Sequence, residues 1–346
     1  MTIEPEPHVP SYINDIRAQP AALDELLKQP VPAEPTELLQ RLESFDRIVL
    51  TGMGSSLQGM YPSFLRLAAA GLPIWFEDSA ELLGYQDGLL TARSLLWVTS
   101  QSGESAEAIA LLDRVARPGG PTVLAVTNDL TSTLATSAAT VLPLHSGDER
   151  TVGTRSYINT LAVFANATSV ALHETPDPEL IEAPAKLAAY LEKWEQRIEE
   201  IDDAIPGTPT FVLGRGASLG SARTGALILK EAARHPVEGM SVPQFRHGPL
   251  EMADHSITVV LLAGADDDRN RNEQMRRDLE ATGARCVWID AQPDVDPSLT
   301  MPHLRGKLAR PLAEILPLQL LSVVLAQRLG HEPGEFRQIE KITRTL

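Results

Sequence analysis

The chain has 346 residues, of which 43% are hydrophobic and 22% charged, a composition typical of a globular protein with a sizeable core. Its formal net charge of −16 argues against a nucleic-acid-binding protein, which usually presents a basic stripe. The apolar runs are short and interrupted, so no membrane span is predicted, and the acidic N-terminus lacks the features of a signal peptide. A cytoplasmic location is the default expectation.

The chain contains a single cysteine, which excludes an intramolecular disulfide and a cysteine-based metal site. Cys286 lies in an apolar segment, residues 284–289, and is expected to be an inert core thiol. No metal site is predicted, because four of the histidines show no metal-ligand spacing; these are His145, His173, His235 and His331.

The first 45 residues are interpreted as a helical lead-in that packs on the main body, with helices over Ser11–Lys28 and Thr36–Glu43. Strand-like and helix-like segments then alternate, a pattern that indicates an α/β fold with parallel sheets flanked by helices. The strands expected in this part of the chain are Arg47–Thr51, Ile74–Phe76, Leu95–Thr99, Thr122–Val126 and Val141–Leu142.

A mostly helical stretch follows from Ser156 to about Glu200, containing the amphipathic segment Lys186–Ile198. The alternation then restarts, and Gly-Arg-Gly-Ala-Ser after one strand matches Gly-Met-Gly-Ser-Ser after an earlier one, which indicates an internal duplication. The further strands expected are Thr210–Leu213, Thr258–Leu262 and Cys286–Ile289. We therefore predict two tandem doubly wound lobes, residues 46–200 and 210–330, with a linker at 201–209 and a tail at 331–346.

Both Gly-x-Gly turns depart from the dinucleotide-binding fingerprint, because Leu57 and Leu219 stand where its third glycine is required. They are interpreted as tight turns between strand and helix. Neither a phosphate-binding P-loop nor a His-Glu-x-x-His zinc motif occurs in the sequence.

The segment Ser100-Gln101-Ser102-Gly103-Glu104-Ser105 joins an apolar strand to a strong helix-forming run. A helix N-terminus has unpaired N–H groups and a positive dipole, and serine hydroxyls add further hydrogen-bond donors. Ser102 or Ser105 could instead simply cap the helix. Three hydroxyls and an amide exceed what capping needs, so we predict an anion site.

Four other features are candidates for chemistry. Glu231, on a largely apolar helix, is either a desolvated general base or part of the solvent face, and the sequence alone favours the solvent face. His247, before a Gly-Pro break, could equally contact a ligand or pack in a loop. Lys341 near the C-terminus is expected in solvent, and the polar loop Glu149–Ser156 could close over a ligand.

Together these segments resemble the SIS (sugar isomerase) family, most closely the isomerase half of the glucosamine-6-phosphate synthases. The resemblance covers nearly the whole chain, with the motifs in the same order. It implies two doubly wound α/β lobes with the phosphosugar bound mainly in the first. The matching segments are Gly54–Ser56, Ser100–Ser105, Val152–Arg155, Leu229–Glu231, Arg246–Leu250, Pro317–Leu321 and Arg337–Lys341.

The resemblance also implies roles for individual residues. Glu231 would move a proton between C1 and C2 through an enediol or enolamine, and Lys341 would lie at C2 and could form a Schiff base. His247 would reach in from a neighbouring subunit to assist ring opening, which requires at least a homodimer. No cofactor is implied. The residues expected to bind the sugar phosphate are Ser55, Ser56, Ser100, Gln101, Ser102, Ser105, Val152 and Gly153.

Departures from the synthases limit the expected reaction. The sequence has no glutaminase domain, so a glutamine-independent isomerase or deaminase of a hexose or amino-hexose 6-phosphate is expected. Arg155 stands near a synthase lysine, and the loop before it is one residue shorter. The alternatives are a fructosamine-6-phosphate deglycase and, ranked lower, a non-catalytic sensor of sugar phosphates.

Overall fold

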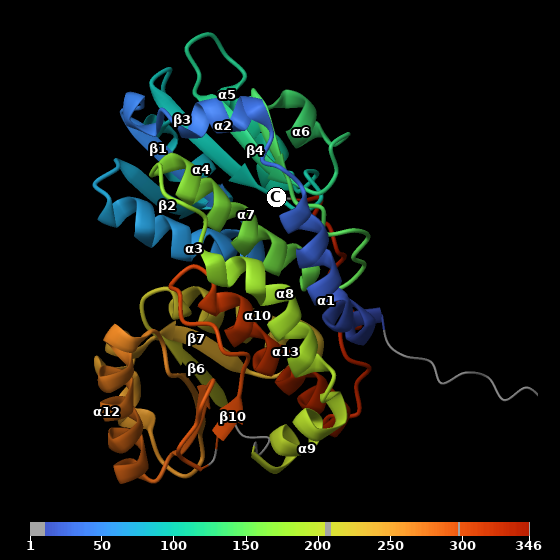
Figure 1. The fold of residues 1–346 in the computed structure, drawn as a ribbon, viewed down its shortest axis with the longest axis vertical. Coiled ribbons are helices and arrows are strands. Elements are labelled where there is room, and N and C mark those ends of the chain that lie inside the picture. Colours follow the sequence, from blue (N-terminus) through green and yellow to red (C-terminus); the bar gives the residue numbers. More distant parts are fainter. Residues whose placement is uncertain (1–10, 205–208, 297, 346) are drawn as a thin grey trace, which may run out of the picture.

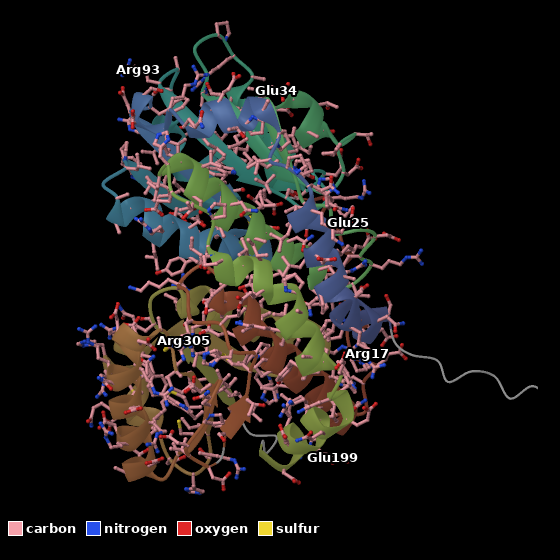
Figure 2. All side chains as sticks on the ribbon, in the orientation of Figure 1. Arg17, Glu25, Glu34, Arg93, Glu199 and Arg305 are labelled. Carbon is pink, nitrogen blue, oxygen red and sulfur yellow. The ribbon has the colours of Figure 1, made fainter. Side chains whose placement is uncertain are left out.

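The computed structural model describes residues 11–204, 209–296 and 298–345. Two α/β lobes are stacked along the long axis of the molecule, each built on a five-stranded parallel sheet with helices on both faces (Figure 1). The predicted fold class is confirmed. Charged side chains such as Glu34, Arg93, Glu199 and Arg305 are exposed on the outside of both lobes (Figure 2).

The first sheet has the strand order β2-β1-β3-β4-β5. Its central strand, β3, is buried along its whole length, as expected for an apolar strand covered on both faces. Trp97 of β3 stacks on Phe164 with ring centroids 4.6 Å apart, which ties the sheet to α7. The elements are β1 (Arg47–Gly52), α3 (Gly54–Ala69), β2 (Ile74–Asp78), α4 (Ser79–Tyr85), η2 (Asp87–Leu89), β3 (Ser94–Thr99), α5 (Ala106–Val115), β4 (Thr122–Thr127), α6 (Thr133–Ser137), β5 (Thr140–Pro143) and α7 (Arg155–Ala171).

The second sheet repeats this order as β7-β6-β8-β9-β10, in agreement with the predicted duplication. Two of its strands were not predicted, because β7 includes a glutamate and a glycine and β10 has only three residues at the sheet edge. The elements are β6 (Thr210–Gly214), α10 (Ser218–Ala233), β7 (Val237–Ser241), α11 (Val242–Arg246), η3 (Pro249–Met252), β8 (Thr258–Leu262), α12 (Asp266–Thr282), β9 (Arg285–Asp290), β10 (Ser298–Thr300) and α13 (Arg310–Arg328).

The N-terminal helices pack on the outside of the lobes. Helix α1 (Ser11–Lys28) has the predicted bounds, whereas the second predicted helix is divided into α2 (Ala33–Leu39) and η1 (Leu42–Ser44). Helix α1 contacts α7 and α8 along its apolar side (Figure 1). The lead-in thereby joins the main hydrophobic core.

The segment predicted to be one amphipathic helix over 186–198 belongs to two helices, α8 (Pro178–Leu191) and α9 (Trp194–Ala204). The chain turns between them, where the Lys193 N–H donates to the Tyr190 carbonyl, three residues back rather than four. Helix α9 includes residues 201–204 of the predicted linker, and residues 205–208 lie outside the described residues.

The two lobes meet where α3 crosses α10. A Cβ atom at Gly220 would lie 2.9 Å from the Gln58 carbonyl oxygen, so only glycine allows the helices to approach this closely. This crossing brings the side chains of α10 to the carboxyl edge of the first sheet. No helix among the described residues combines the length and apolar character needed to cross a bilayer.

Candidate active site

A pocket with a volume of about 270 Å³ opens at the carboxyl ends of β1 and β3. These neighbouring strands carry connections to opposite sides, which makes this edge the topological switch point where doubly wound sheets bind ligands. The loop after β1 begins α3, and the loop after β3 begins α5. The pocket therefore faces two helix N-termini, which favour an anion.

The serine-rich loop after β3 is folded so that its hydroxyls gather at the pocket. Ser105 is the N-cap residue of α5, but its side chain makes no capping hydrogen bond. Its Oγ lies 3.5 Å from Ser100 Oγ, and the Ser102 hydroxyl accepts from the Glu104 N–H at 3.2 Å. The simple capping interpretation thus fails for Ser105, whose hydroxyl lines the pocket with those of Ser100 and Ser102.

Gly103 sets the turn of this loop. Its φ of +67° lies in the left-handed region that favours glycine, and a Cβ atom there would collide with the Ser132 side chain. The loop is further held by the Gln101 carbonyl, which accepts from the Asn128 N–H at 3.0 Å. The hydroxyls are therefore positioned by a fixed backbone.

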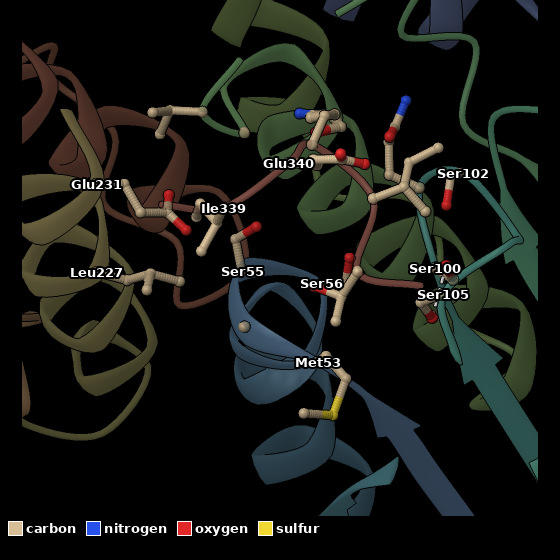
Figure 3. A pocket seen from close by; sticks show the side chains of 18 of the residues that line it. Met53, Ser55, Ser56, Ser100, Ser102, Ser105, Leu227, Glu231, Ile339 and Glu340 are labelled. Atoms are coloured by element: carbon tan, nitrogen blue, oxygen red, sulfur yellow. Dashed lines mark hydrogen bonds between the residues drawn. The ribbon is translucent and has the colours of Figure 1, made fainter. Parts of the chain in front are cut away.

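The floor of the pocket is formed by Ser55 and Ser56 in the first turn of α3. Val152 and Gly153 line it from the loop before α7. A Cβ atom at Gly153 would lie 3.0 Å from Ser55 Oγ, so this loop packs directly on the start of α3. Figure 3 shows Ser55 and Ser56 between the serine-rich loop and α10.

Glu231 enters the pocket from the second lobe, on α10 and opposite the serine-rich loop (Figure 3). Leu227, one helical turn earlier, lines the same pocket, as expected for residues four apart on one face. Burial, opposed by the Lys341 charge, raises the pKa of Glu231 to about 7. The solvent-face interpretation of Glu231 is therefore wrong, and its carboxyl group can accept or donate a proton near neutral pH.

Lys341 is held at the pocket by the C-terminal segment, which runs from α13 back to the first lobe (Figure 1). The segment is anchored to α10 where the Gly334 N–H donates to the Ala232 carbonyl at 3.2 Å. Further along, the Thr343 carbonyl accepts from the Ala106 N–H at 2.9 Å. The side chain of Lys341 is 23% exposed, so the expectation of a lysine in open solvent is wrong.

From the sequence alone, Glu149 is named only as the first residue of the loop Glu149–Ser156, with no role of its own. Its side chain is fully buried, and its Oε2 accepts from Lys341 Nζ at 3.0 Å. The same carboxylate accepts four hydrogen bonds from the backbone N–H and hydroxyl groups of Thr154 and Ser156. The usable signal was an acidic residue followed within seven positions by two hydroxyl residues at a helix start.

Burial alone would raise the pKa of Glu149, but the Lys341 ammonium and the hydrogen bonds from Ser156 and Thr154 outweigh it and lower that pKa. Glu149 is therefore ionised behind the pocket wall, whereas Glu231, which lines the pocket, titrates near neutrality. Two carboxyl groups with separated pKa values are a frequent arrangement in acid–base catalysis.

Of the eleven residues expected at the site, His247 is the one that does not line the pocket. It is exposed between α11 and η3. Arg155 also points elsewhere, since its guanidinium donates to Asp15 of α1 at 2.8 Å. Cys286 is buried, which raises its pKa to about 12, as expected for an inert thiol. Within the described residues no group of His, Cys, Asp and Glu side chains could hold a metal ion.

The two sides of the pocket differ in their chemistry. Hydroxyls and a helix N-terminus at one side suit an anionic group, and Glu231 across the pocket, on which the Lys341 charge acts, suits proton transfer beside a carbonyl or imine. Two further carboxylates, Glu107 and Glu340, also line the pocket. A small molecule with a phosphate at one end and a carbonyl or imine carbon at the other matches this arrangement.

Comparison with known proteins shows the family of the chain. The SIS domain model matches residues 42–170 and 210–297, one segment in each lobe. Glutamine–fructose-6-phosphate aminotransferase (isomerizing) of Pyrococcus horikoshii is 28% identical over 350 residues, covering 95% of this chain and 56% of the relative. The chain spans about half the length of the curated relatives it matches.

Two solved structures share the fold. The C-terminal domain of glucosamine-fructose-6-phosphate aminotransferase from Francisella tularensis superposes with a TM-score of 0.81 and 21% identity, covering 96% of this chain and all of that one. Glucosamine-6-phosphate deaminase from Thermotoga maritima superposes with a TM-score of 0.78 and 18% identity, covering 96% of this chain and 99% of that one. At these identities the likeness concerns the fold.

Proposed function

The chain belongs to the SIS domain family, and on that premise we propose that it is an isomerase or deaminase of a hexose or amino-hexose 6-phosphate. The observation that carries the proposal is the position of Glu231 across the pocket from the serine-rich loop (Figure 3). Its pKa of about 7 suits a group that removes and returns one proton. The names of the relatives support the substrate class.

In the proposed reaction, Ser100, Ser102 and Ser105 bind the phosphate, and the open-chain sugar extends toward α10. The Glu231 carboxylate removes the proton from C2 of the aldose. The electron pair of that bond forms a C1–C2 double bond while the C1 oxygen takes up a proton, giving an enediol. Return of the proton to C1 and loss of the hydroxyl proton at C2 gives the ketose.

For a 2-amino sugar the same proton transfer gives an enolamine and then an imine at C2. Attack of water on this imine releases ammonia and leaves the ketose phosphate. Lys341, whose charge acts on Glu231, would contact the substituent at C2 and could form a Schiff base with the ketose. Both directions of reaction use the same residues.

We further propose that His247 is supplied to this pocket by a second copy of the chain. Its exposed position, outside the pocket of its own chain, is consistent with donation across a dimer interface. There it would transfer a proton during ring opening, because the ring nitrogens of an imidazole can both accept and donate a proton. The working enzyme would then be at least a homodimer.

The test is incubation of the purified protein with glucosamine 6-phosphate, followed by assays for ammonia and fructose 6-phosphate. Release of both supports the deaminase. Interconversion of glucose 6-phosphate and fructose 6-phosphate without ammonia release supports the isomerase. Turnover of fructosamine 6-phosphate alone would replace the proposal with a deglycase, and binding without turnover of any of these would replace it with a sensor.

A further inference from the structure

Among the described residues, Lys341 forms one ion pair, with Glu149, which lies 192 positions earlier in the chain. Lys341 Nζ also donates to the Thr151 carbonyl, two residues after Glu149. The ammonium group is thus held by a single short loop of the first lobe. The loop itself is folded around the Glu149 carboxylate, through the hydrogen bonds from Thr154 and Ser156.

Both carboxylate oxygens of Glu149 are fully occupied. Oε1 accepts from the Thr154 N–H at 2.7 Å, from its hydroxyl at 2.9 Å and from the Ser156 N–H at 3.3 Å. Oε2 accepts from the Ser156 hydroxyl at 2.5 Å and from Lys341 Nζ at 3.0 Å. A buried carboxylate with five donors is stabilised in its ionised form, so Glu149 is unsuited to accept a proton from a substrate.

We propose that Glu149 is a positioning residue that fixes Lys341, and with it the C-terminal segment, over the reacting end of the pocket. This inference rests on the proposed function for its catalytic consequence, but the contact it describes belongs to the protein alone. Glu149 does not line the pocket, whereas Thr151, Val152 and Lys341, which it organises, do. It acts on a bound molecule only through these residues.

The loop offers a matched control for this role. Asp148, directly before Glu149, is exposed and pairs with Arg150 at the surface at 3.2 Å. Asp148→Asn removes the same charge as Glu149→Gln one position away, without touching Lys341 or the hydrogen bonds that fold the loop. A difference between these variants therefore reports the contact rather than the net charge.

The first experiment measures the rate at which an amine-specific acylating reagent labels Lys341 in the protein without substrate, by peptide mass spectrometry. Lys28, an exposed lysine paired with Asp24, is the internal standard. We expect Lys341 to be labelled about tenfold faster in Glu149→Gln than in wild type, because the ammonium group has lost a charged hydrogen-bond partner. In Asp148→Asn the labelling rate of Lys341 should match that of wild type. Equal rates in the two variants would overturn the proposal, whatever the substrate proves to be.

The second experiment separates positioning from stability by kinetics. With the substrate that the assay under Proposed function identifies, Glu149→Gln should lower kcat by about 100-fold, the size of effect expected from misplacing a group by about 1 Å. KM should change by less than about threefold, because the serine-rich loop is untouched. A kcat equal to that of Asp148→Asn contradicts the proposal, and a failure of wild type to turn over contradicts only the proposed function.

Glu149→Asp keeps the charge but withdraws the carboxylate by one methylene, and it serves if the glutamine variant does not fold. In this variant Lys341 should be labelled faster than in Asp148→Asn but more slowly than a fully exposed lysine. Its kcat should lie between those of Glu149→Gln and wild type. Circular dichroism and the elution volume of each variant verify that the fold is intact. Wild-type labelling in a folded Glu149→Asp variant would also refute the positioning role.

Discussion

The two lobes share one strand order, yet the loops at corresponding positions have opposite chemistry. After β3 the first lobe has a serine-rich loop, whereas after β8 the second lobe has Ala263, Gly264 and Ala265, followed by three aspartates. Asp266, Asp267 and Asp268 occupy the first turn of α12, where their charges already complement the helix dipole. The second lobe therefore has its own carboxylates at the helix N-terminus that corresponds to the proposed phosphate site of the first lobe.

The crevice of the second lobe is also closed by buried charges. Arg310 donates to Glu314 at 2.9 Å and to Asp290 at 3.3 Å, and all three side chains are nearly inaccessible. Ser218, at the start of α10, donates its hydroxyl to Glu314 at 2.7 Å. The corresponding edge of the first lobe opens into a pocket, whereas in the second lobe the protein's own charged side chains pair with one another there.

The largest effect expected is on turnover. Glu231→Gln keeps the shape of the side chain but removes the base, so kcat should fall by about 100- to 10,000-fold. Binding of fructose 6-phosphate, measured by calorimetry, should change little because the serine-rich loop is unaltered. Wild-type activity should rise with pH through about 7, where Glu231 becomes ionised. Retained turnover would show that Glu231 is not the base. It would also contradict the assignment of the active site to the pocket at the edge of the first sheet.

A large effect on stability is expected in the second lobe. Arg310→Met leaves Glu314 without its cation, and losing one partner of a buried ion pair costs about 3–5 kcal/mol. The free energy of unfolding in urea measures this cost. Arg93→Met, which breaks an exposed pair with Asp46, is the control and should leave the free energy of unfolding close to that of wild type. Equal losses would show that the second crevice is not closed by its charges.

A pH-dependent effect links the proposed base to stability. The pKa of Glu231 is raised in the folded protein from 4.5 to about 7, so the folded state binds the proton more tightly than the unfolded state. Stability relative to Glu231→Gln should therefore be greatest below about pH 4.5 and fall by up to about 3 kcal/mol as pH rises through 7.

Urea denaturation of both proteins across this range measures the difference. Glu238→Gln on β7, where the glutamate is exposed, removes the same charge and is the control. A constant difference between wild type and Glu231→Gln would mean that the carboxyl group is not desolvated in the fold.

The smallest effect tests the contrast between corresponding loops. Ser105→Ala removes one hydroxyl from the proposed phosphate site, and a lost hydrogen bond to a charged group should weaken sugar-phosphate binding by about tenfold or more. Asp266→Asn, at the start of α12, should leave the affinity unchanged. Equal weakening by both substitutions would contradict the assignment of the ligand to the first lobe.

Much of the fold was predictable because its strands are apolar runs ending in turns. The bounds of α1 and of β8 follow the sequence pattern directly, and β3 differs by a single residue. Strand β7, Val237–Ser241, was missed because it has neither an apolar run nor a regular alternation; its pairing with β6 supplies the missing information.

The site was predictable in its parts but not in its connections. The segment Ser100–Ser105 can be recognised in the sequence by its position between a strand and a helix. The burial of Glu231 and the contact between Glu149 and Lys341 depend on the crossing of α3 with α10 and on the path of the C-terminal segment. These are tertiary contacts between residues far apart in sequence, and no local pattern encodes them.

The position of Leu227 and Glu231 on one face of α10 restricts how the length of this helix can change. Leu227 and Glu231 share one face because four residues make about one helical turn. Inserting or deleting a single residue between them would rotate one side chain by about 100° relative to the other and carry it out of the pocket. Helix α10 should therefore tolerate exchanges among its apolar residues far better than any change in its length.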